Sequence, residues 1–253
     1  MLFTESVFVG IDPTSGHRSF TYAALDRGLN LIALGGGEME DVMAFLGVQP
    51  SATVAVNAPS DVNHGLVRKN LKGQSLTPHT LRGVEMRVAE HELRGYGIAV
   101  SGTGARESLC PAWVQAGFAL YEKLSKAGFK SYPEEGASHQ WLETHPHAAF
   151  CVLLGESPLQ KSTLEGRLQR ELLLYERGVR IKDPMDFFEE ITRHKLMRGI
   201  LPMEQVHIPE QLDALVAAYT AWLAMERPSD VTRIGHKQEG FITLPATSLK
   251  EKY

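Results

Sequence analysis

The sequence predicts a protein of the α/β class. Three observations support this class: a nearly continuous apolar run at residues 6–11, an alternation of strand-like and helical runs after it, and an ordinary globular composition. The chain has 253 residues, of which 43% are hydrophobic and 22% are charged, so disorder and collagen-like repeats are excluded. A chain of this length forms one large domain or two small ones, and it buries enough surface to form a core without stabilising disulfides or metal ions.

The first sixty residues contain four predicted strands and one helix. Residues 6–11 combine apolar and β-favouring side chains, which is typical of a strand covered on both faces. The turn Asp26-Arg27-Gly28 separates two more strand-like runs, and three glycines precede a short helix. The remaining elements, in order, are strands at 19–25 and 29–34, a helix at 38–46 and an apolar strand at 53–56. We therefore expect the order strand, hairpin, hairpin, helix, strand.

Residues 60–110 lose this regularity and are predicted to form an irregular insertion or a lid. Long irregular segments in compact domains are usually functional covers or disordered. Residues 66–106 contain seven Lys or Arg residues and three acidic ones. This local positive charge fits a solvated surface or, alternatively, a lid that faces an anion.

Helical periodicity returns after residue 110. The predicted helices cover 111–126, 146–154, 164–177, 183–198 and 209–225, and the predicted strands cover 137–144 and 241–244. Pro146 suits the first turn of its helix. We interpret residues 155–205 as an extra helical segment. In the last helix, the core stripe consists of Leu212, Leu215, Val216, Tyr219 and Leu223.

Charge, cysteine content and hydropathy indicate which binding partners and which cellular compartment to expect. The chain has 26 Lys and Arg residues against 30 Asp and Glu, a net charge of -4, so binding of nucleic acid would need a local basic patch. Two cysteines without metal-type spacing suit a reducing cytosol. The N-terminus lacks a basic signal-peptide region, and no run approaches the ~20 apolar residues of a membrane span. We expect a cytoplasmic protein; its oligomeric state stays open.

Asp12 and Asn57 each stand at the carboxyl end of a predicted buried strand. Ligands of open α/β sheets gather beyond these strand ends, so the two side chains converge on one crevice if their strands are neighbours. An ionised Asp is costly to desolvate there unless a cation or a donor lies close by. The alternative interpretation is that Asp12 caps the turn that follows it.

Asp213 is the only acidic residue between Glu210 and Glu226 in the last helix. Its neighbours are apolar, which favours burial of Asp213 over exposure on the surface of the helix. The small residues Ala214, Ala217 and Ala218 allow this helix to approach a sheet closely. Glu210, one turn earlier, equally fits an exposed acid that stabilises the helix dipole.

Glu143 is the third acidic candidate, at the end of the strand predicted at 137–144. Three histidines surround it in sequence, His139, His145 and His147, yet Pro146 breaks the register and no cysteine is near, which argues against zinc. Oxygen ligands at several strand ends favour Mg²⁺ or Mn²⁺ instead.

Several motifs, taken in order, make the chain similar to the predicted ribonuclease H-like nucleases of domain-of-unknown-function family 429. The motifs are Val9-Gly10-Ile11-Asp12, Val54-Ala55-Val56-Asn57-Ala58-Pro59, Arg87-Val88-Ala89-Glu90, Glu143-Thr144-His145-Pro146, Lys161-Ser162-Thr163, Gly166-Arg167 with Arg170, Leu212-Asp213-Ala214-Leu215, and Glu239-Gly240-Phe241-Ile242. The resemblance implies a single ribonuclease H-like domain over residues 1–253. Its sheet would be mixed, with an antiparallel three-strand edge followed by parallel strands and with helices on both faces.

The resemblance also implies a metal site and its ligands. Asp12, Glu143 and Asp213 would be the catalytic acids that hold two divalent ions, Mg²⁺ or Mn²⁺, with Asn57 as a further ligand. The family usually has Asp where this chain has Asn57, and an amide oxygen attracts a hard cation less strongly than a carboxylate does. Arg87, Lys161, Arg167 and Arg170 are the candidate substrate-binding residues, and solvation on a helix surface is the alternative for the last three.

Three functions follow as hypotheses. The first is a metal-dependent phosphodiester hydrolase, in which the metals activate water and stabilise the leaving oxygen. The second is a non-catalytic module of the same fold that binds nucleic acid or a nucleotide, which Asn57 and the basic segment favour. The third is a phosphotransferase of a related fold that also begins with a strand ending in Asp. Whether the substrate is DNA, RNA or a small phosphate ester stays open.

Overall fold

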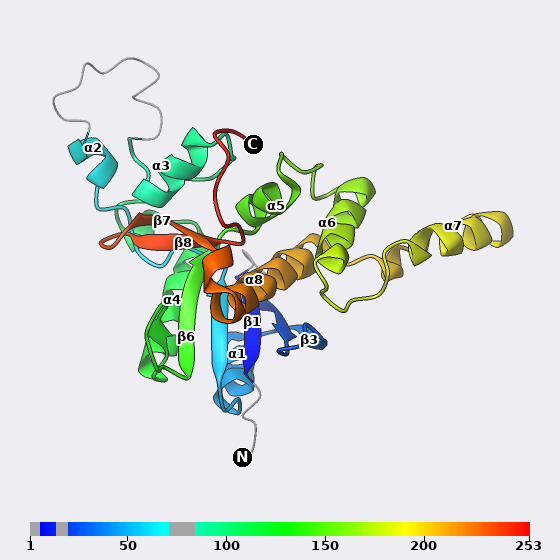
Figure 1. Ribbon diagram of the computed structural model, residues 1–253, viewed down its shortest axis with the longest axis horizontal. Coiled ribbons are helices and arrows are strands. Elements are labelled where there is room, and N and C mark those ends of the chain that lie inside the picture. The colour runs from blue at the N-terminus through cyan, green and yellow to red at the C-terminus, as the bar shows by residue number, and fades with distance from the viewer. Residues whose placement is uncertain (1–5, 14–19, 71–83) are drawn as a thin grey trace.

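The computed structural model describes residues 6–13, 20–70 and 84–253, and these form one mixed sheet covered by helices (Figure 1). The sheet has eight strands in the order β3-β2-β1-β4-β6-β8-β7, and β5 pairs with β6. The strands are β1 (Val7–Asp12), β2 (Phe20–Leu25), β3 (Leu31–Gly37), β4 (Ala52–Val56), β5 (Lys130–Ser131), β6 (His139–Thr144), β7 (Thr232–His236) and β8 (Gly240–Leu244).

Antiparallel pairs lie at both edges of the sheet, and parallel pairs lie at its centre. β1, β2 and β3 are antiparallel neighbours at one edge. β1, β4, β6 and β8 run parallel through the centre, and β7 closes the other edge antiparallel to β8. The predicted order of the first sixty residues is therefore confirmed. The strands β5 and β7 were not expected from the sequence.

Helices cover both faces of the sheet. They are α1 (Met39–Gly47), α2 (Leu66–Asn70), α3 (Val88–Gly95), α4 (Ala112–Lys126), α5 (Pro146–Leu154), α6 (Leu164–Glu176), α7 (Asp186–Met197) and α8 (Pro209–Glu226), with short 3-10 turns at Glu107–Leu109, Met203–Gln205 and Pro228–Asp230. One core layer joins α5, α6 and α8 to the face that carries Phe8 and Ala55. The other joins α1 and α4 to the face that carries Val9 and Val56.

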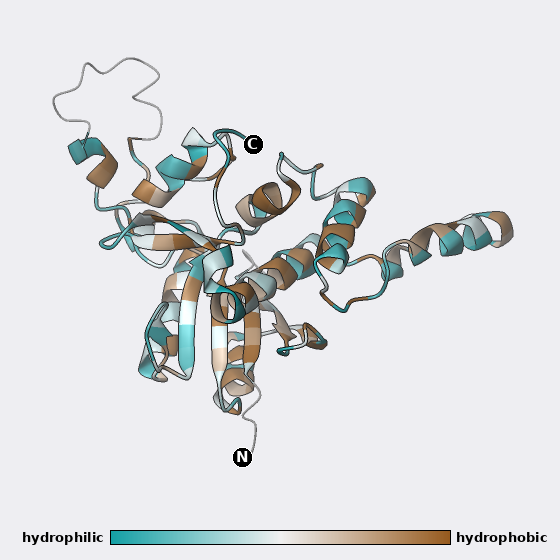
Figure 2. Cartoon of the chain, in the orientation of Figure 1, coloured by the Kyte–Doolittle hydropathy of each residue, from teal (hydrophilic) through white to brown (hydrophobic). Residues whose placement is uncertain are grey.

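Helix α8 lies at the centre of the molecule. The sequence predicts a single apolar stripe on it, but every side chain from Leu212 to Ala224 is buried. The reason is that β1 and β2 cover its inner face while α5 and α6 pack on other sides. Figure 2 shows the resulting apolar centre, where β1, β4 and much of α8 are brown, whereas β6 carries more hydrophilic residues. A carboxylate on this helix is consequently surrounded by protein.

The segment predicted to be an irregular insertion contains two helices where the structure describes it. α3 packs on β7 and β8, and its Ala89 and Leu93 join a third hydrophobic cluster with Ile234 and Leu244. Residues 71–83, which include Lys72 and Arg82 of the basic segment, lie outside the described residues. None of the helices in the described ranges has the length and apolarity that crossing a membrane requires.

Candidate active site

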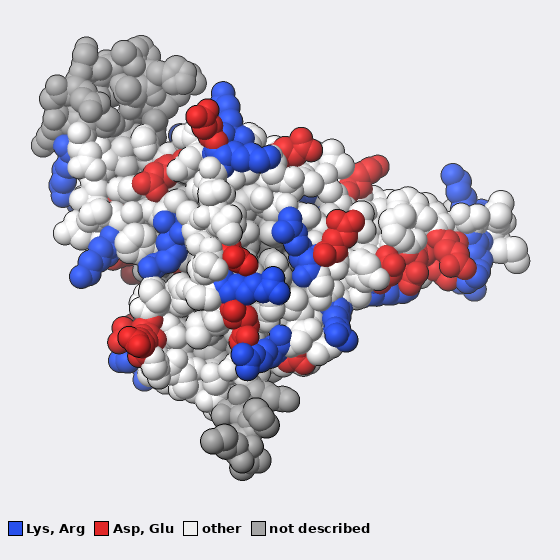
Figure 3. All heavy atoms as spheres, viewed as in Figure 1, with Lys and Arg blue, Asp and Glu red and all other residues white. Residues whose placement is uncertain are grey.

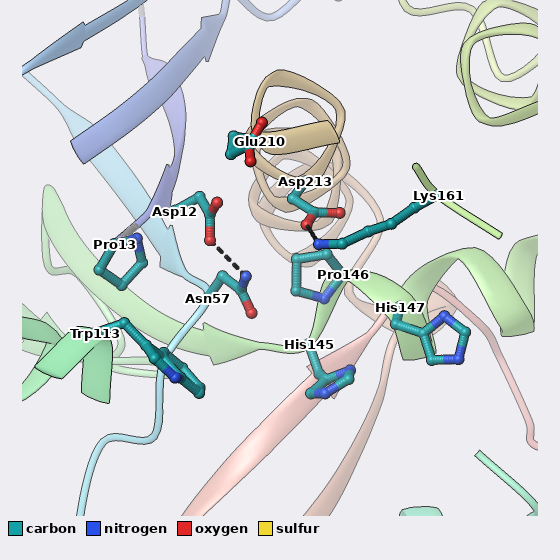
Figure 4. Close-up of a pocket in the computed structure, with 10 residues that line it drawn as sticks. All are labelled: Asp12, Pro13, Asn57, Trp113, His145, Pro146, His147, Lys161, Glu210 and Asp213. Carbon is teal, nitrogen blue, oxygen red and sulfur yellow. Dashed lines mark hydrogen bonds and ion pairs between the residues drawn. The ribbon is translucent and has the colours of Figure 1, made fainter. Parts of the chain in front are cut away.

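A polar cavity of about 490 Å³, which we call the Asp12 cavity, opens at the carboxyl end of β1. Asp12 ends this strand and Asn57 follows β4, while Asp213 reaches the cavity from α8 (Figure 4). The other lining residues are Pro13, Trp113, His145, Pro146, His147, Lys161 and Glu210. The structure thus brings Asp12, Asn57 and Asp213 to one cavity, together with Lys161, and this matches the position that strand-end reasoning indicates.

Close packing between β1 and α8 fixes the distance between Asp12 and Asp213. A Cβ atom at Gly10 would lie 1.9 Å from the carbonyl oxygen of Ala214 and 2.8 Å from the Cβ of Ala217. Only a residue without a side chain fits at this position. The expected close approach of a helix with small residues is confirmed, and it places the first turns of α8 against the end of the strand.

Asp12 is held in a carboxylate-rich and poorly solvated position. Its side chain is 7% exposed, and its Oδ1 accepts a hydrogen bond of 2.6 Å from the Nδ2 of Asn57. Burial, followed by the charge of Asp213, raises the pKa of Asp12 to about 7, although the Asn57 bond and Lys161 act in the opposite direction. Near neutral pH this acid can therefore exist in both protonation states.

Asp213 binds a cationic side chain, and within the described part of the chain this partner is Lys161. The Nζ of Lys161 donates a hydrogen bond of 2.7 Å to its Oδ2, as the dashed line in Figure 4 marks. Burial nevertheless raises the pKa of Asp213, and Lys161 only partly offsets this effect. The pKa of Lys161 is raised in turn, because the charges of Asp213 and Asp12 outweigh its own desolvation. Among the described residues that line the cavity, carboxylates consequently outnumber the cationic side chains.

Two histidines supply neutral polar groups to the same cavity. Burial, with His147 next in importance, lowers the pKa of His145 to about 4, and burial also lowers the pKa of His147. The Nδ1 of His145 accepts a hydrogen bond of 3.1 Å from the backbone N–H of Ala148, at the start of α5. An accepting Nδ1 leaves the proton of the neutral ring on Nε2, which can donate to a ligand.

Glu143 lies outside this cavity, on the opposite face of the sheet. In the parallel register, Ile11 aligns with Val56, and Val56 aligns with Glu143. Because side chains alternate between faces, Glu143 shares the face of Ile11 and Val56, whereas Asp12 and Asn57, one residue later, share the other. The structure therefore does not group Glu143 with Asp12 and Asp213, and its assignment as a metal ligand stays a prediction.

Glu143 instead belongs to a buried ion-pair network, which we call the Arg87 network. The guanidinium of Arg87 donates to Oε2 of Glu143 at 3.0 Å, to Oε1 of Glu90 at 2.8 Å and to the carbonyl of Glu239 at 2.8 Å. Ser60 adds a backbone N–H and a hydroxyl donor to Glu143, both at 2.8 Å. Burial opposes the charge of Arg87, but Glu143 and Glu90 outweigh it and raise the pKa of Arg87.

The sequence does not identify Glu90 and Glu239 as partners in this network. Glu239 is fully buried, and its two oxygens accept backbone N–H bonds from His64 and Val88, each at 2.8 Å. The only signal is that both acids stand inside motifs shared with the related family. Trp113, which lines the cavity, likewise reads in the sequence as one position on the core face of a helix.

The predicted substrate-binding residues separate into two groups. Lys161 lines the cavity. The other three side chains bind protein groups: Arg87 in the network above, Arg167 on the carbonyls of Val206 and His207, and Arg170 on the carbonyls of Leu159 and Gly166. Arg170 is also nearly fully buried. In this geometry Lys161 is the candidate best placed to meet a ligand.

The donor set of the cavity fits a hard divalent cation to a limited extent. Among the residues that the structure describes, no three His, Cys, Asp or Glu side chains are grouped closely enough to hold a metal ion. Two buried carboxylates with a nearby amide oxygen still suit Mg²⁺ or Mn²⁺, because Mg²⁺ is commonly held by one or two carboxylates together with water and substrate phosphate. Asp12 and Asp213, with the Oδ1 of Asn57, would be these ligands.

The fold and the site define a mixed α/β protein with a carboxylate cavity at the carboxyl ends of its central strands. The model of the family described as protein of unknown function (DUF429) matches residues 10–237, so the chain belongs to this family. No curated protein and no solved structure matches the chain in the comparisons.

Proposed function

We propose that this protein is a divalent-metal-dependent phosphodiester hydrolase, a nuclease of ribonuclease H-like topology. One observation carries the proposal: Asp12 and Asp213 are buried in the same cavity, and Lys161 is the one Lys or Arg among the described residues that line it. Two desolvated carboxylates with one ammonium group are poorly balanced, and a cationic ligand would relieve this imbalance.

The arrangement of the sheet supports the topology. Three antiparallel strands at one edge lead into the parallel strands β4 and β6, and helices cover both faces. This is the arrangement that the family resemblance implies. Acids at the end of the first strand and on a late helix also occupy the places that the resemblance assigns to the metal ligands.

Each residue that lines the cavity has its own role in the proposed hydrolysis. Asp12, oriented by Asn57, and Asp213 hold a cation, which when bound supplies an activated water and neutralises phosphate charge. Lys161 is more than half exposed, so it can leave Asp213 for a phosphate oxygen. His145 donates from Nε2 without adding charge, and Trp113 offers an aromatic wall on which a base can stack.

The test measures metal binding and hydrolysis on the same protein. Calorimetric titration with Mn²⁺ at pH 8 should show binding to the wild type and its loss in Asp12→Asn and Asp213→Asn. Hydrolysis of a bis-aryl phosphate, single-stranded DNA and RNA in Mg²⁺ or Mn²⁺ should fall by about 100-fold or more in both variants. Asp61→Asn, a substitution of the same type at an exposed acid outside this cavity, is the matched control.

Glu143→Gln separates the two assignments of that residue. The geometry predicts unchanged Mn²⁺ affinity in this variant, whereas a metal ligand would lose affinity on the same change. Absence of Mn²⁺ binding by the wild type, together with no turnover of any of the three substrates, would contradict the proposed hydrolase.

A non-catalytic phosphate-binding module is the second candidate. The ion pair between Lys161 and Asp213 favours it, because this contact neutralises one carboxylate without any metal. Salt-sensitive binding of an oligonucleotide that does not depend on Mg²⁺, is lost in Lys161→Ala and persists in Asp12→Asn would support this function over hydrolysis.

A further inference from the structure

A separate cavity of about 320 Å³ lies beside β7 and β8, and we call it the Arg233 cavity. It shares no lining residue with the Asp12 cavity. Two basic residues line it: Arg233 on β7, and Lys237 in the turn that joins β7 to β8. Figure 3 shows basic side chains on the surface around this hairpin, at the left of the view. Positive charge and a hollow in the surface therefore coincide at this edge of the sheet.

The guanidinium of Arg233 lies over two aromatic rings. Its central carbon is 4.4 Å from the centre of the Phe241 ring and 5.7 Å from the centre of the Tyr132 ring. Arg233 pairs with Thr243 across the hairpin, so these two side chains and that of Phe241 share one face of the sheet. The Tyr132 hydroxyl donates a hydrogen bond of 2.9 Å to the carbonyl of Ala224, which fixes its ring. A guanidinium stacked in this way keeps the N–H groups at its edge for hydrogen bonds.

The positive charge of Arg233 is not balanced by an acid within the part of the chain that the structure describes. Its buried Nε has no hydrogen-bond acceptor there. Burial lowers the pKa of Arg233, and the group that opposes this shift is the Tyr132 phenol rather than a carboxylate. Burial acts on Arg87 in the same direction, but Glu143 and Glu90 outweigh it and raise the pKa of Arg87. A partly buried cation without an acid is a place where an anionic ligand is stabilised.

Other polar groups on the wall of the cavity suit an oxyanion. The hydroxyl of Thr243 is fully buried and has no hydrogen-bond partner among the described residues. Ser131 and Lys237 line the cavity as exposed donors. Two acids line it as well, but Glu143 is already paired in the network described above, and the Asp61 side chain is 50% exposed, where solvent screens its charge.

The two cations favour a phosphate group over a carboxylate. The planar guanidinium of arginine binds either group through parallel N–H···O bonds. A phosphate monoester carries about −1.5 to −2 charges near neutral pH and offers three acceptor oxygens, whereas a carboxylate carries a single charge on two oxygens. Because Arg233 and Lys237 line the same cavity, the more highly charged group gains more from them.

We propose that the Arg233 cavity binds the phosphate group of a small phosphate monoester, with Arg233 as the main contact and with Lys237 and Thr243 as further donors. A cavity of about 320 Å³ has room for a phosphate group and for part of the organic group attached to it. The inference goes beyond the proposed hydrolase, because binding here needs neither a metal ion nor the aspartates of the Asp12 cavity.

The experiment is a calorimetric titration of the full chain in EDTA at pH 8. The probes are adenosine monophosphate and glycerol phosphate, which share the phosphate group, and acetate, which supplies a carboxylate. Both phosphate esters should bind the wild type more tightly than acetate does. Arg233→Met should weaken their binding by about tenfold or more. Arg94→Met, at an exposed position on α3 outside the cavity, should leave it unchanged. Lys161→Ala should also leave it unchanged, because Lys161 lines the other cavity.

Thermal melts show whether Arg233 acts only by packing. Methionine keeps apolar contact with the two rings, so Arg233→Met should fold. Arg233→Lys, which keeps the charge but loses the planar fork, is the second variant and should bind with intermediate affinity. Saturating glycerol phosphate should raise the melting temperature of the wild type but not that of Arg233→Met.

The outcomes separate the proposal from its alternatives. Tighter binding of adenosine monophosphate than of glycerol phosphate would support a nucleotide as the ligand, and equal binding would support recognition of the phosphate group alone. Four results would each overturn the proposal: no binding of either phosphate ester, tighter binding of acetate, equal affinity in the wild type and Arg233→Met, or loss of binding in Lys161→Ala.

Discussion

The Asp12 cavity and the Arg87 network both contain buried carboxylates, but they satisfy them differently. In the network, Glu143 and Glu90 share one guanidinium and receive further donors from Ser60 and Thr103. In the cavity, counting only residues 6–13, 20–70 and 84–253, Asp12 accepts one side-chain amide hydrogen bond and Asp213 accepts one from an ammonium group. Paired and fully bonded carboxylates can be structural, whereas incompletely compensated ones leave a place for a ligand.

The two regions should also differ in how substitutions change the stability of the protein. Removing one partner of a buried ion pair leaves an uncompensated charge, so the Arg87 network should be intolerant of substitution. Removing a negative charge from the cavity should instead relieve the unfavourable burial and repulsion of its carboxylates in the folded protein. Arg87→Met in the network and Asp12→Asn in the cavity, each of which removes one charge, should thus change the free energy of unfolding in opposite directions.

The largest effect is expected for Arg87→Met. This change leaves Glu90 and Glu143 buried without their cation and should lower the free energy of unfolding by about 3–5 kcal/mol. Urea denaturation at pH 7 measures it. Arg68→Met, which breaks an exposed pair with Glu85, is the control and should cost at most about 1 kcal/mol. Similar losses in the two variants would mean that the network is no more than a surface-type interaction.

The next effect is a gain in stability on Asp12→Asn. Burial raises the pKa of Asp12 from 3.8 to about 7, so the folded state binds a proton more tightly than the unfolded state does. The stabilising contribution is complete below pH 4 and is lost as the pH rises through 7. Asp12→Asn removes this loss and should stabilise the metal-free protein at pH 8 by about 2–3 kcal/mol.

At pH 4 the same substitution should have little effect, because Asp12 is then protonated in the folded state. Urea denaturation at the two pH values measures the difference. A destabilisation at pH 8 would show that Asp12 is adequately compensated, and it would remove the contrast between the two regions.

The smallest effect is expected for Asn57→Asp, and its sign should depend on metal. Without metal, a third carboxylate beside Asp12 adds repulsion and removes the Asn57 donor, so the melting temperature at pH 8 should fall. With Mn²⁺, the added ligand should strengthen binding, and the stabilisation by metal should exceed that of the wild type by a few degrees. A thermal melt with and without Mn²⁺ measures both. A variant that melts lower in both conditions would argue against a cation at this position.

Much of the fold follows from local sequence patterns. Apolar runs predict β1, β2, β3 and β4, and helical periodicity gives α4, α5 and α8 within a few residues. β5 and β7 escape prediction for a physical reason. β5 has two exposed residues, and β7 is an edge strand that carries Arg233 and Gly235, so neither shows the apolar pattern of a buried strand.

The site was only partly predictable. Strand ends predict that Asp12 and Asn57 lie together, and an acid on an apolar helix indicates that Asp213 is buried, whereas only the family resemblance assigns Asp213 to the same site as Asp12. The position of Glu143 depends on the register of β6 against β4, and a shift of one residue exchanges the two faces. Its pairing with Arg87 joins residues 56 positions apart, and no local pattern encodes such a contact.

The contact at Gly10 has a consequence for how the two aspartates behave. Backbone atoms of β1 and α8 touch there, so the spacing between the segments that carry Asp12 and Asp213 is set by main-chain contact and cannot be closed further or relaxed by rotamer changes. The paired acids are thereby preorganised in the folded protein before anything binds. Gly10→Ala would add one methyl group at this junction and would change the spacing between Asp12 and Asp213 without altering either residue.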